Sequence, residues 1–267
     1  MLNPTSITTD KRFLVWGISR SGIHAIASWV YDNHHGNKVF LNDQLYDSEL
    51  TSSCHPGAYL YNYNQHKLSN RLIFEGDVFS SSVLSIIVFE NHDLACGNGD
   101  WFCRMIIGCA NKCHNVLILR NLYDHYASFI SIHNDYKHAL PTKRATRNLT
   151  SVNGFHLELW KMYAREMIEP KHLPPDTIRV YYDSWIQSSD YRKEIAAKFG
   201  FFSNGEAYRK VSHYGGGSSF DGTKFHGCAP QMKLRNRWEQ ISVTEQSLLL
   251  DAISKDEEIQ ELCDFFR

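Results

Sequence analysis

The sequence predicts an α/β fold in which a mostly parallel central sheet lies between two layers of helices. Short apolar runs, typical of buried strands, alternate along the chain with segments whose apolar residues recur every three or four positions, as in helices. One such strand leads into a glycine-bounded loop and a helix, which is a P-loop-like arrangement. We expect residues 1–267 to form a single three-layer domain, because 267 residues with 43% hydrophobic content suffice for one sizeable core.

The strand, loop and helix occupy residues 13–30. Phe13–Trp16 is a short apolar run, and Gly17–Gly22 is a six-residue turn. The helix that follows places its apolar residues on one face, at Ile23, Ile26, Ala27 and Val30. A helix N-terminus behind such a turn offers free backbone N–H groups, so the loop predicts a phosphate or sulfate ligand. The alternative is an ordinary strand-to-helix turn, and the loop by itself does not decide between the two.

The loop keeps only part of the P-loop pattern. A nucleotide triphosphatase follows the second glycine with Lys and Ser/Thr, which hold the phosphates and Mg²⁺, whereas this chain has Ile23 and His24 there. Its cation comes earlier, at Arg20. Because phosphoryl transfer depends strongly on the metal, the loop favours an anion-binding transferase that works without Mg²⁺.

The remaining elements follow the same alternation. Further strands are predicted at residues 38–42, 71–75, 84–90, 115–119 and 177–182. Helices are predicted at residues 101–110, 124–133, 154–169 and 189–199, and as a pair from residue 243 onward. Residues 1–11 read as a polar lead-in, and the basic residues 137–151 as a mobile surface loop. Ligands of parallel sheets bind beyond the carboxyl ends of the strands, where residues 19–22, His92 and Arg120 are expected to converge.

Composition narrows the classes of partner. A net charge of −1 argues against a nucleic-acid partner and a polyanionic acceptor.

The seven cysteines show no paired framework, which indicates reduced thiols and a cytoplasmic protein. Four possible zinc ligands lie close in sequence, but their spacing fits no zinc pattern and we expect no metal site: Cys103, Cys109, Cys113 and His114. No apolar run approaches the roughly 18 residues of a membrane span and the first residues do not resemble a signal peptide, so no membrane partner is expected.

A more specific pattern follows the strand predicted at residues 115–119. Arg120-Asn121-Leu122-Tyr123-Asp124-His125-Tyr126-Ala127-Ser128 resembles the motif Arg-Asn-Pro-x-Asp-x-x-x-Ser, and only the proline is replaced. This motif binds the 3′-phosphate in sulfotransferases that use 3′-phosphoadenosine-5′-phosphosulfate (PAPS). The resemblance implies that Arg120 offers its fork of donors to that phosphate and that Ser128, two helical turns on, adds a neutral donor. A cation that opens a helix opposes the helix dipole, which also favours an anion beside Arg120.

Other segments resemble that family in the same order along the chain. The family's Pro-Lys-Ser-Gly-Thr-Thr-Trp loop corresponds to residues 19–25, with Arg20 on the lysine. The resemblance implies that this loop holds the 5′-phosphosulfate through Ser19, Arg20, Ser21, Gly22, Ile23 and His24. A Lys-Thr-His segment, which ends in the family's base, corresponds to Glu90-Asn91-His92. A closing basic glycine-rich loop on the 3′-phosphate corresponds to Gly216, Gly217 and Ser218, with the charge supplied by Arg235 or Arg237, and we select Arg235.

The resemblance covers residues 12–240 and implies a PAPS-dependent sulfotransferase with the product 3′-phosphoadenosine-5′-phosphate (PAP). A sulfuryl group would move in line to a hydroxyl or amine of a small-molecule acceptor, such as a natural product, with His92 as base and Arg20 stabilising the leaving oxygen. Rival bases are Glu75, Asp93 and His24. The alternatives are a P-loop-type small-molecule kinase and a nucleotide-binding protein with a degenerate site. Either a monomer or a homodimer fits this description.

Overall fold

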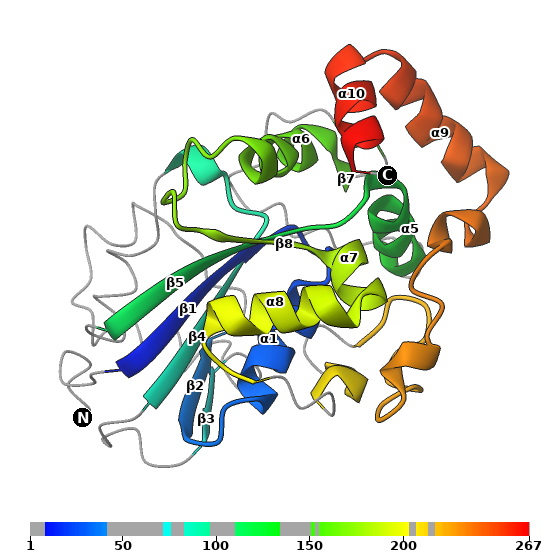
Figure 1. The fold of residues 1–267 in the computed structure, drawn as a ribbon. Coiled ribbons are helices and arrows are strands. Elements are labelled where there is room, and N and C mark those ends of the chain that lie inside the picture. The colour runs from blue at the N-terminus through cyan, green and yellow to red at the C-terminus, as the bar shows by residue number, and fades with distance from the viewer. Residues whose placement is uncertain are drawn as a thin grey trace.

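The computed structural model describes residues 9–41, 72–75, 83–96, 110–133, 151–152, 155–202, 207–212 and 217–266. These residues form an α/β fold around one six-stranded sheet, as predicted (Figure 1). The strands of the sheet are β1 (Thr9–Gly17), β2 (Asn37–Leu41), β3 (Leu72–Glu75), β4 (Val83–Glu90), β5 (Ala110–Leu119) and β8 (Ile178–Tyr181). A separate two-stranded sheet pairs β6 (Ser151–Val152) with β7 (Phe155–His156).

Helices connect these strands along the chain and follow the last of them. They are α1 (Ile23–Asp32), α5 (Leu122–His133), α6 (Leu157–Ile168), α7 (Tyr182–Gln187), α8 (Ser189–Phe199), α9 (Val243–Ser254) and α10 (Glu257–Phe265). Short 3₁₀ helices are η3 (Leu94–Cys96), η5 (Ala207–Arg209), η7 (Ala229–Gln231) and η8 (Arg237–Gln240). The predicted helix pair at the C-terminal end is therefore confirmed as α9 and α10.

The large sheet has the order β3-β2-β4-β1-β5-β8, and β2, β4, β1, β5 and β8 run parallel. The edge strand β3 runs antiparallel to β2. The parallel strands therefore bring their carboxyl ends to one edge of the sheet, whereas β3 brings its carboxyl end to the opposite edge.

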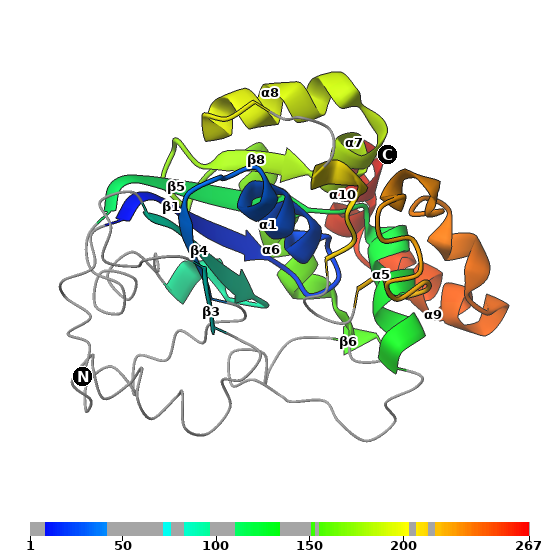
Figure 2. The same cartoon turned by 90° about the horizontal axis from the view of Figure 1, so that it is seen from below.

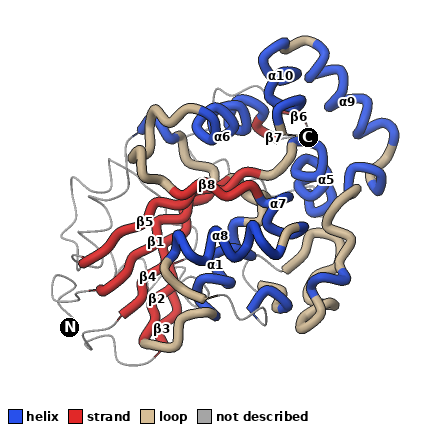
Figure 3. The backbone as a smooth tube through the Cα atoms, in the orientation of Figure 1, coloured by secondary structure: helices blue, strands red, loops and turns tan. Residues whose placement is uncertain are grey.

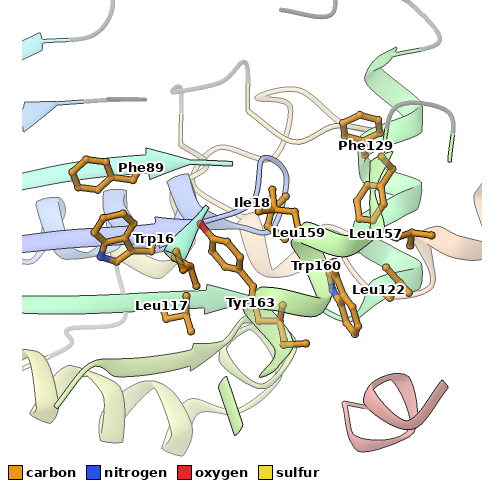
Figure 4. Packing of buried hydrophobic residues seen from close by; sticks show 14 of the residues in the cluster. Trp16, Ile18, Phe89, Leu117, Leu122, Phe129, Leu157, Leu159, Trp160 and Tyr163 are labelled. Carbon is orange, nitrogen blue, oxygen red and sulfur yellow. The ribbon is translucent and has the colours of Figure 1, made fainter. Parts of the chain in front are cut away.

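The two faces of the sheet carry two separate cores, which makes the fold three-layered. Because side chains alternate along a strand, Phe13 and Val15 of β1 pack with α1, α7 and α8, and Leu14 and Trp16 pack with α5, α6, α9 and α10. Figures 1 and 2 show α1 and α8 on one side of the sheet and α6 on the other, and Figure 3 shows the same layers by secondary structure. Figure 4 shows the second core, in which Trp16 stacks on Phe89.

Some boundaries differ from those predicted. Strand β5 begins at Ala110, whereas the sequence predicted its start at Asn115. The prediction missed the first half of the strand because that half is exposed or half-buried and carries no apolar run. The last residue of the helix predicted at residues 101–110, Ala110, belongs to strand β5 instead. The other residues of that prediction, 101–109, lie outside the described residues. Strand β1 begins at Thr9, inside the predicted lead-in, and residues 137–150 of the predicted surface loop are not described.

Candidate functional site

The parallel register brings the predicted loop and the two neighbouring strand ends together. Gly17, the last residue of β1, pairs with Glu90 of β4 and with Ile118 of β5, two residues before Arg120. A pocket opens at this edge, toward the side where α7 and η7 lie. Eight of the residues predicted to bind the cofactor line it: Ser19, Arg20, Gly22, Ile23, His24, Arg120, Gly217 and Ser218.

The loop between β1 and α1 takes an unusual backbone path. Arg20 and Gly22 both adopt left-handed conformations, with φ of 73° and 93°. Gly22 is required for a second reason, since a Cβ atom there would lie 2.3 Å from the ring of Tyr182. Tyr182 opens α7 directly after β8, and its ring also lies 5.5 Å below the guanidinium of Arg120. One aromatic ring therefore separates the loop from the predicted phosphate-binding arginine.

Both backbone groups of Ser19 are held by side chains. Its N–H donates to Oδ1 of Asn91 at 2.9 Å, and its carbonyl oxygen accepts from Nε2 of His125 at 2.8 Å. A carbonyl only accepts, so the proton of His125 is on Nε2. Complete burial lowers the pKa of His125 to about 3, so its ring is neutral. The loop is thus fixed from the end of β4 and from α5, and the N–H of Ser19 is not available to an anion.

Arg120 is buried and lies between the end of β5 and the start of α5. Its Nη1 donates to Oγ of Ser128 at 2.7 Å, and its Nη2 donates to the carbonyl of Leu234 at 2.7 Å. The carbonyl of Arg120 itself accepts from the indole of Trp160 in α6 at 3.0 Å. Backbone and side chain are therefore both fixed before any ligand arrives.

A second buried arginine, Arg237, lies beside Arg120. Its Nη1 donates to the same Oγ of Ser128 at 3.2 Å, and its Nη2 donates to Oγ of Ser218 at 2.7 Å. Asp221 lies 3.5 Å from the same guanidinium. Burial, together with the positive charge of Arg120, lowers the pKa of Arg237 to about 10. Two cations thus share one serine oxygen away from water.

Several donors of this site have no partner within the part of the chain that the structure describes. In the arginine pair they are Nε of Arg120 and Nε of Arg237, both buried, and behind the loop the buried hydroxyl of Ser21 also has none. Ser128, which was predicted to bind the cofactor, is fully buried and does not line the pocket, and its Oγ accepts from both arginines and holds them together. Buried donors of positive charge without an acceptor are costly, so the donor set fits a phosphate or sulfate dianion.

The start of α5 is anchored by a network of carboxylates and an amide. Asn121 donates from its backbone and its side chain to Asp183, at 2.8 Å in each case, and its Oδ1 accepts from the N–H of Asp124. Asp124 in turn accepts from the N–H of Trp238 at 3.0 Å, which ties η8 to α5. The Asn and Asp of the sequence motif therefore position Arg120 and Arg237, and burial raises the pKa of Asp183.

His24 and Glu90 face each other in the pocket, where the motif of a nucleotide triphosphatase would have a hydroxyl. Nε2 of His24 lies 3.5 Å from Oε1 of Glu90, and both side chains are mostly buried. Glu90 stands where the family has a lysine, so this position contributes a carboxylate to the pocket and not a cation. Lys210 also lines the pocket and lies 3.4 Å from Asp32.

The predicted base lies elsewhere. His92 is not among the residues that line this pocket, and its ring contacts Trp16 and Phe89 edge-on, on the α6 side of the sheet. Its carbonyl accepts from the hydroxyl of Tyr163. Asp93 accepts from the N–H of Ala95 and opens η3.

Glu75 lies at the wrong end of the sheet to be the base. It pairs with Lys38, near the start of β2, because β3 is antiparallel. The carboxyl edge that carries the pocket is therefore at the other end of the strands.

Of the two arginines considered for the closing loop, Arg237 and not Arg235 enters the pocket. Arg235 is exposed and lines two neighbouring hollows, whereas Arg237 is buried. Ser21 lies behind the loop and not on the pocket surface, and Gly216 lies outside the described residues. Sequence reasoning also missed Tyr182 as a residue of the pocket and placed it at the end of the strand predicted at residues 177–182, whereas it opens α7.

Comparison with known proteins assigns this chain to no family. A scan against protein-family models and a search of curated proteins both find no match. Within the described ranges, no helix has the length and apolar character needed to cross a membrane. In the same ranges, no group of three His, Cys, Asp or Glu side chains is arranged to hold a metal, and Cys103 and Cys109 lie outside them.

Proposed function

We propose that this chain is a sulfotransferase that moves a sulfuryl group from PAPS to a hydroxyl or amine of a small molecule and releases PAP. The observation that carries the proposal is the pair of buried arginines, Arg120 and Arg237, joined through Ser128. Two like charges held together in a water-poor site repel each other, and a dianion between them removes that cost. The 3′-phosphate of PAPS is such a dianion.

The loop supplies the other half of the proposed cofactor site. The N-terminus of α1 opens on the pocket behind Gly22, so its free N–H groups and helix dipole favour the 5′-phosphosulfate. Arg20 lines the same pocket and would stabilise the charge that develops on the bridging oxygen as the sulfur–oxygen bond breaks. Arginine does not deprotonate, so Arg20 acts by its charge and not as an acid.

A kinase reading has less support. Mg²⁺ at a P-loop is held by the hydroxyl that follows the lysine, and this position is His24, which faces Glu90.

We further propose a small-molecule acceptor, no nucleic-acid partner, a cytoplasmic location, and a monomer or homodimer.

Calorimetric titration with PAP tests the cofactor, with ADP and ATP·Mg²⁺ as comparison ligands. Wild type is run beside Arg120→Ala and Ser128→Ala, and beside Arg165→Ala as a matched control. Arg165 is an exposed arginine of α6 that pairs with Glu258 outside the pocket, so its loss removes a charge without touching the site.

We expect tight binding of PAP that neither comparison ligand matches. Arg120→Ala should weaken it by about 100-fold or more and Ser128→Ala by about tenfold, because a buried charge-assisted hydrogen bond contributes about 1.5–3 kcal/mol. Arg165→Ala should bind like wild type. Equal binding of ATP·Mg²⁺, or indifference to both site variants, would overturn the proposal.

A further inference from the structure

We propose that His24 is the base that takes the acceptor's proton, with Glu90 as its positioning partner, so that the phosphate-binding loop itself carries the proton acceptor. The inference rests on the proposed function and names a residue of the same pocket. His24 is the second residue of α1 and Glu90 is the last residue of β4, and both line the pocket beside the proposed leaving group.

Elimination among the described pocket residues supports this assignment. Arg20, Arg120 and Arg237 do not give up a proton near neutral pH. Burial raises the pKa of Tyr182 and of Tyr208, so both phenols stay protonated. Lys210 forms an ion pair with Asp32, at 3.4 Å. Among the titratable side chains that line the pocket, His24 and Glu90 remain.

The geometry of the pair assigns different roles to the two groups. Nε2 of His24 faces Oε1 of Glu90 at 3.5 Å, so the carboxylate favours a proton on Nε2 and leaves Nδ1 as the nitrogen that accepts. The same carboxylate stabilises the imidazolium that forms when Nδ1 takes a proton. Glu90 is fixed in turn, because it pairs with Gly17 in the sheet.

The step balances without a further reactant. The acceptor oxygen or nitrogen forms a bond to sulfur while the bond between sulfur and the bridging oxygen breaks. The electron pair of the broken bond stays on the 5′-phosphate of PAP, and the acceptor's proton moves to Nδ1 of His24.

The test measures sulfuryl transfer from PAPS labelled in its sulfuryl group, in single turnovers, to phenol, aniline and water as probe acceptors. His24→Gln, Glu90→Gln and His92→Gln are compared with wild type. His172→Gln is the matched control, since His172 is an exposed histidine in the segment after α6, outside the pocket. PAP affinity is measured by calorimetry for every variant.

We expect His24→Gln to slow transfer by at least about 100-fold, as the loss of a general base does. Its PAP affinity should stay within about threefold of wild type, because the amide keeps the size and polarity of the ring. Glu90→Gln should also slow transfer while its PAP affinity stays within about threefold of wild type, because an amide does not stabilise the imidazolium that forms in the step.

Three outcomes would overturn the assignment. They are wild-type transfer by His24→Gln, loss of transfer in His92→Gln while His24→Gln stays active, and a wild-type chain that binds PAP tightly but transfers to none of the probes. A chain that does not bind PAP at all instead defeats the proposed function, so the two failures are distinguishable.

Discussion

The loop after β1 and the arginine pair, Arg120 after β5 and Arg237 at the start of η8, face the same pocket, yet their donors are held in different ways. The arginine side uses the guanidinium groups of Arg120 and Arg237, which are fixed by the hydroxyls of Ser128 and Ser218. Its cost is electrostatic, because two buried cations lie side by side. The loop side uses backbone in left-handed conformations at Arg20 and Gly22, and its cost is conformational.

The difference shows that two parts of one pocket can be arranged for an anion in two independent ways, one by placing buried charges together and one by fixing the backbone. A charge cost is removed when the ligand binds, so it favours the bound state directly. A conformational cost is met by folding, through Asn91, His125 and Tyr182 around the loop, and it is the same with and without ligand. Substitutions on the two sides should therefore affect binding and stability in different proportions.

On the arginine side we expect the largest effect, from Arg237→Met. It should weaken PAP binding by about a thousandfold, about 4 kcal/mol, because a desolvated cation contacting the ligand is lost. The free energy of unfolding of the ligand-free chain should change by no more than about 1 kcal/mol, because relief of repulsion offsets the lost hydrogen bonds. Calorimetry with PAP and urea unfolding measure the two quantities.

Arg235→Met is the matched control for that pair of measurements. Arg235 belongs to the same basic segment but is exposed and lines other hollows. A larger loss of PAP affinity in Arg235→Met than in Arg237→Met would show that the sequence-based choice of Arg235 was correct.

On the loop side Gly22→Ala should instead destabilise the chain. The new Cβ would lie 2.3 Å from the Tyr182 ring and would add strain at φ 93°, so we expect a loss of about 3 kcal/mol in the free energy of unfolding. Gly227→Ala is the control, since Gly227 has φ 86° but nothing within 4 Å of the added atom, and it should cost about 1 kcal/mol. Equal losses in urea unfolding would mean that the Tyr182 contact does not restrain the loop.

Sequence reasoning located both sides of the pocket because each follows a buried strand. The apolar run of β1 and the two glycines fixed the position of the loop, and Arg120 directly follows the apolar half of β5. Parallel connection then places these strand ends at one edge, which requires no knowledge of side-chain packing.

The choice between Arg235 and Arg237 was not available from the sequence. Both lie in a basic segment without periodicity, and the left-handed backbone of Asn236, with φ 63°, turns one inward and leaves the other exposed. The direction of β3 was equally hidden, because a four-residue edge strand reads the same in either direction. The pairing of His24 with Glu90 depends on the register between β1 and β4, which no local pattern encodes.

His125 connects the two sides, and its burial predicts how stability responds to pH. The pKa of this group is about 3 in the folded chain and about 6.5 when exposed, so below pH 6.5 the unfolded state binds a proton that the folded state does not. Stability should therefore be unaffected by this group above pH 6.5 and fall as the pH is lowered. Between pH 6.5 and 5 the loss from His125 should be about 1.6 kcal/mol.

Urea unfolding of wild type and His125→Gln across that range isolates the effect. The glutamine amide keeps a donor for the carbonyl of Ser19 but does not titrate, and the lowered pKa values of His34 and His114 contribute equally to both chains and cancel in the difference. The variant should therefore lose about 1.6 kcal/mol less than wild type between pH 6.5 and 5. Parallel losses would mean that His125 reaches solvent and does not fix the loop to α5, and the two sides of the pocket would then be held independently.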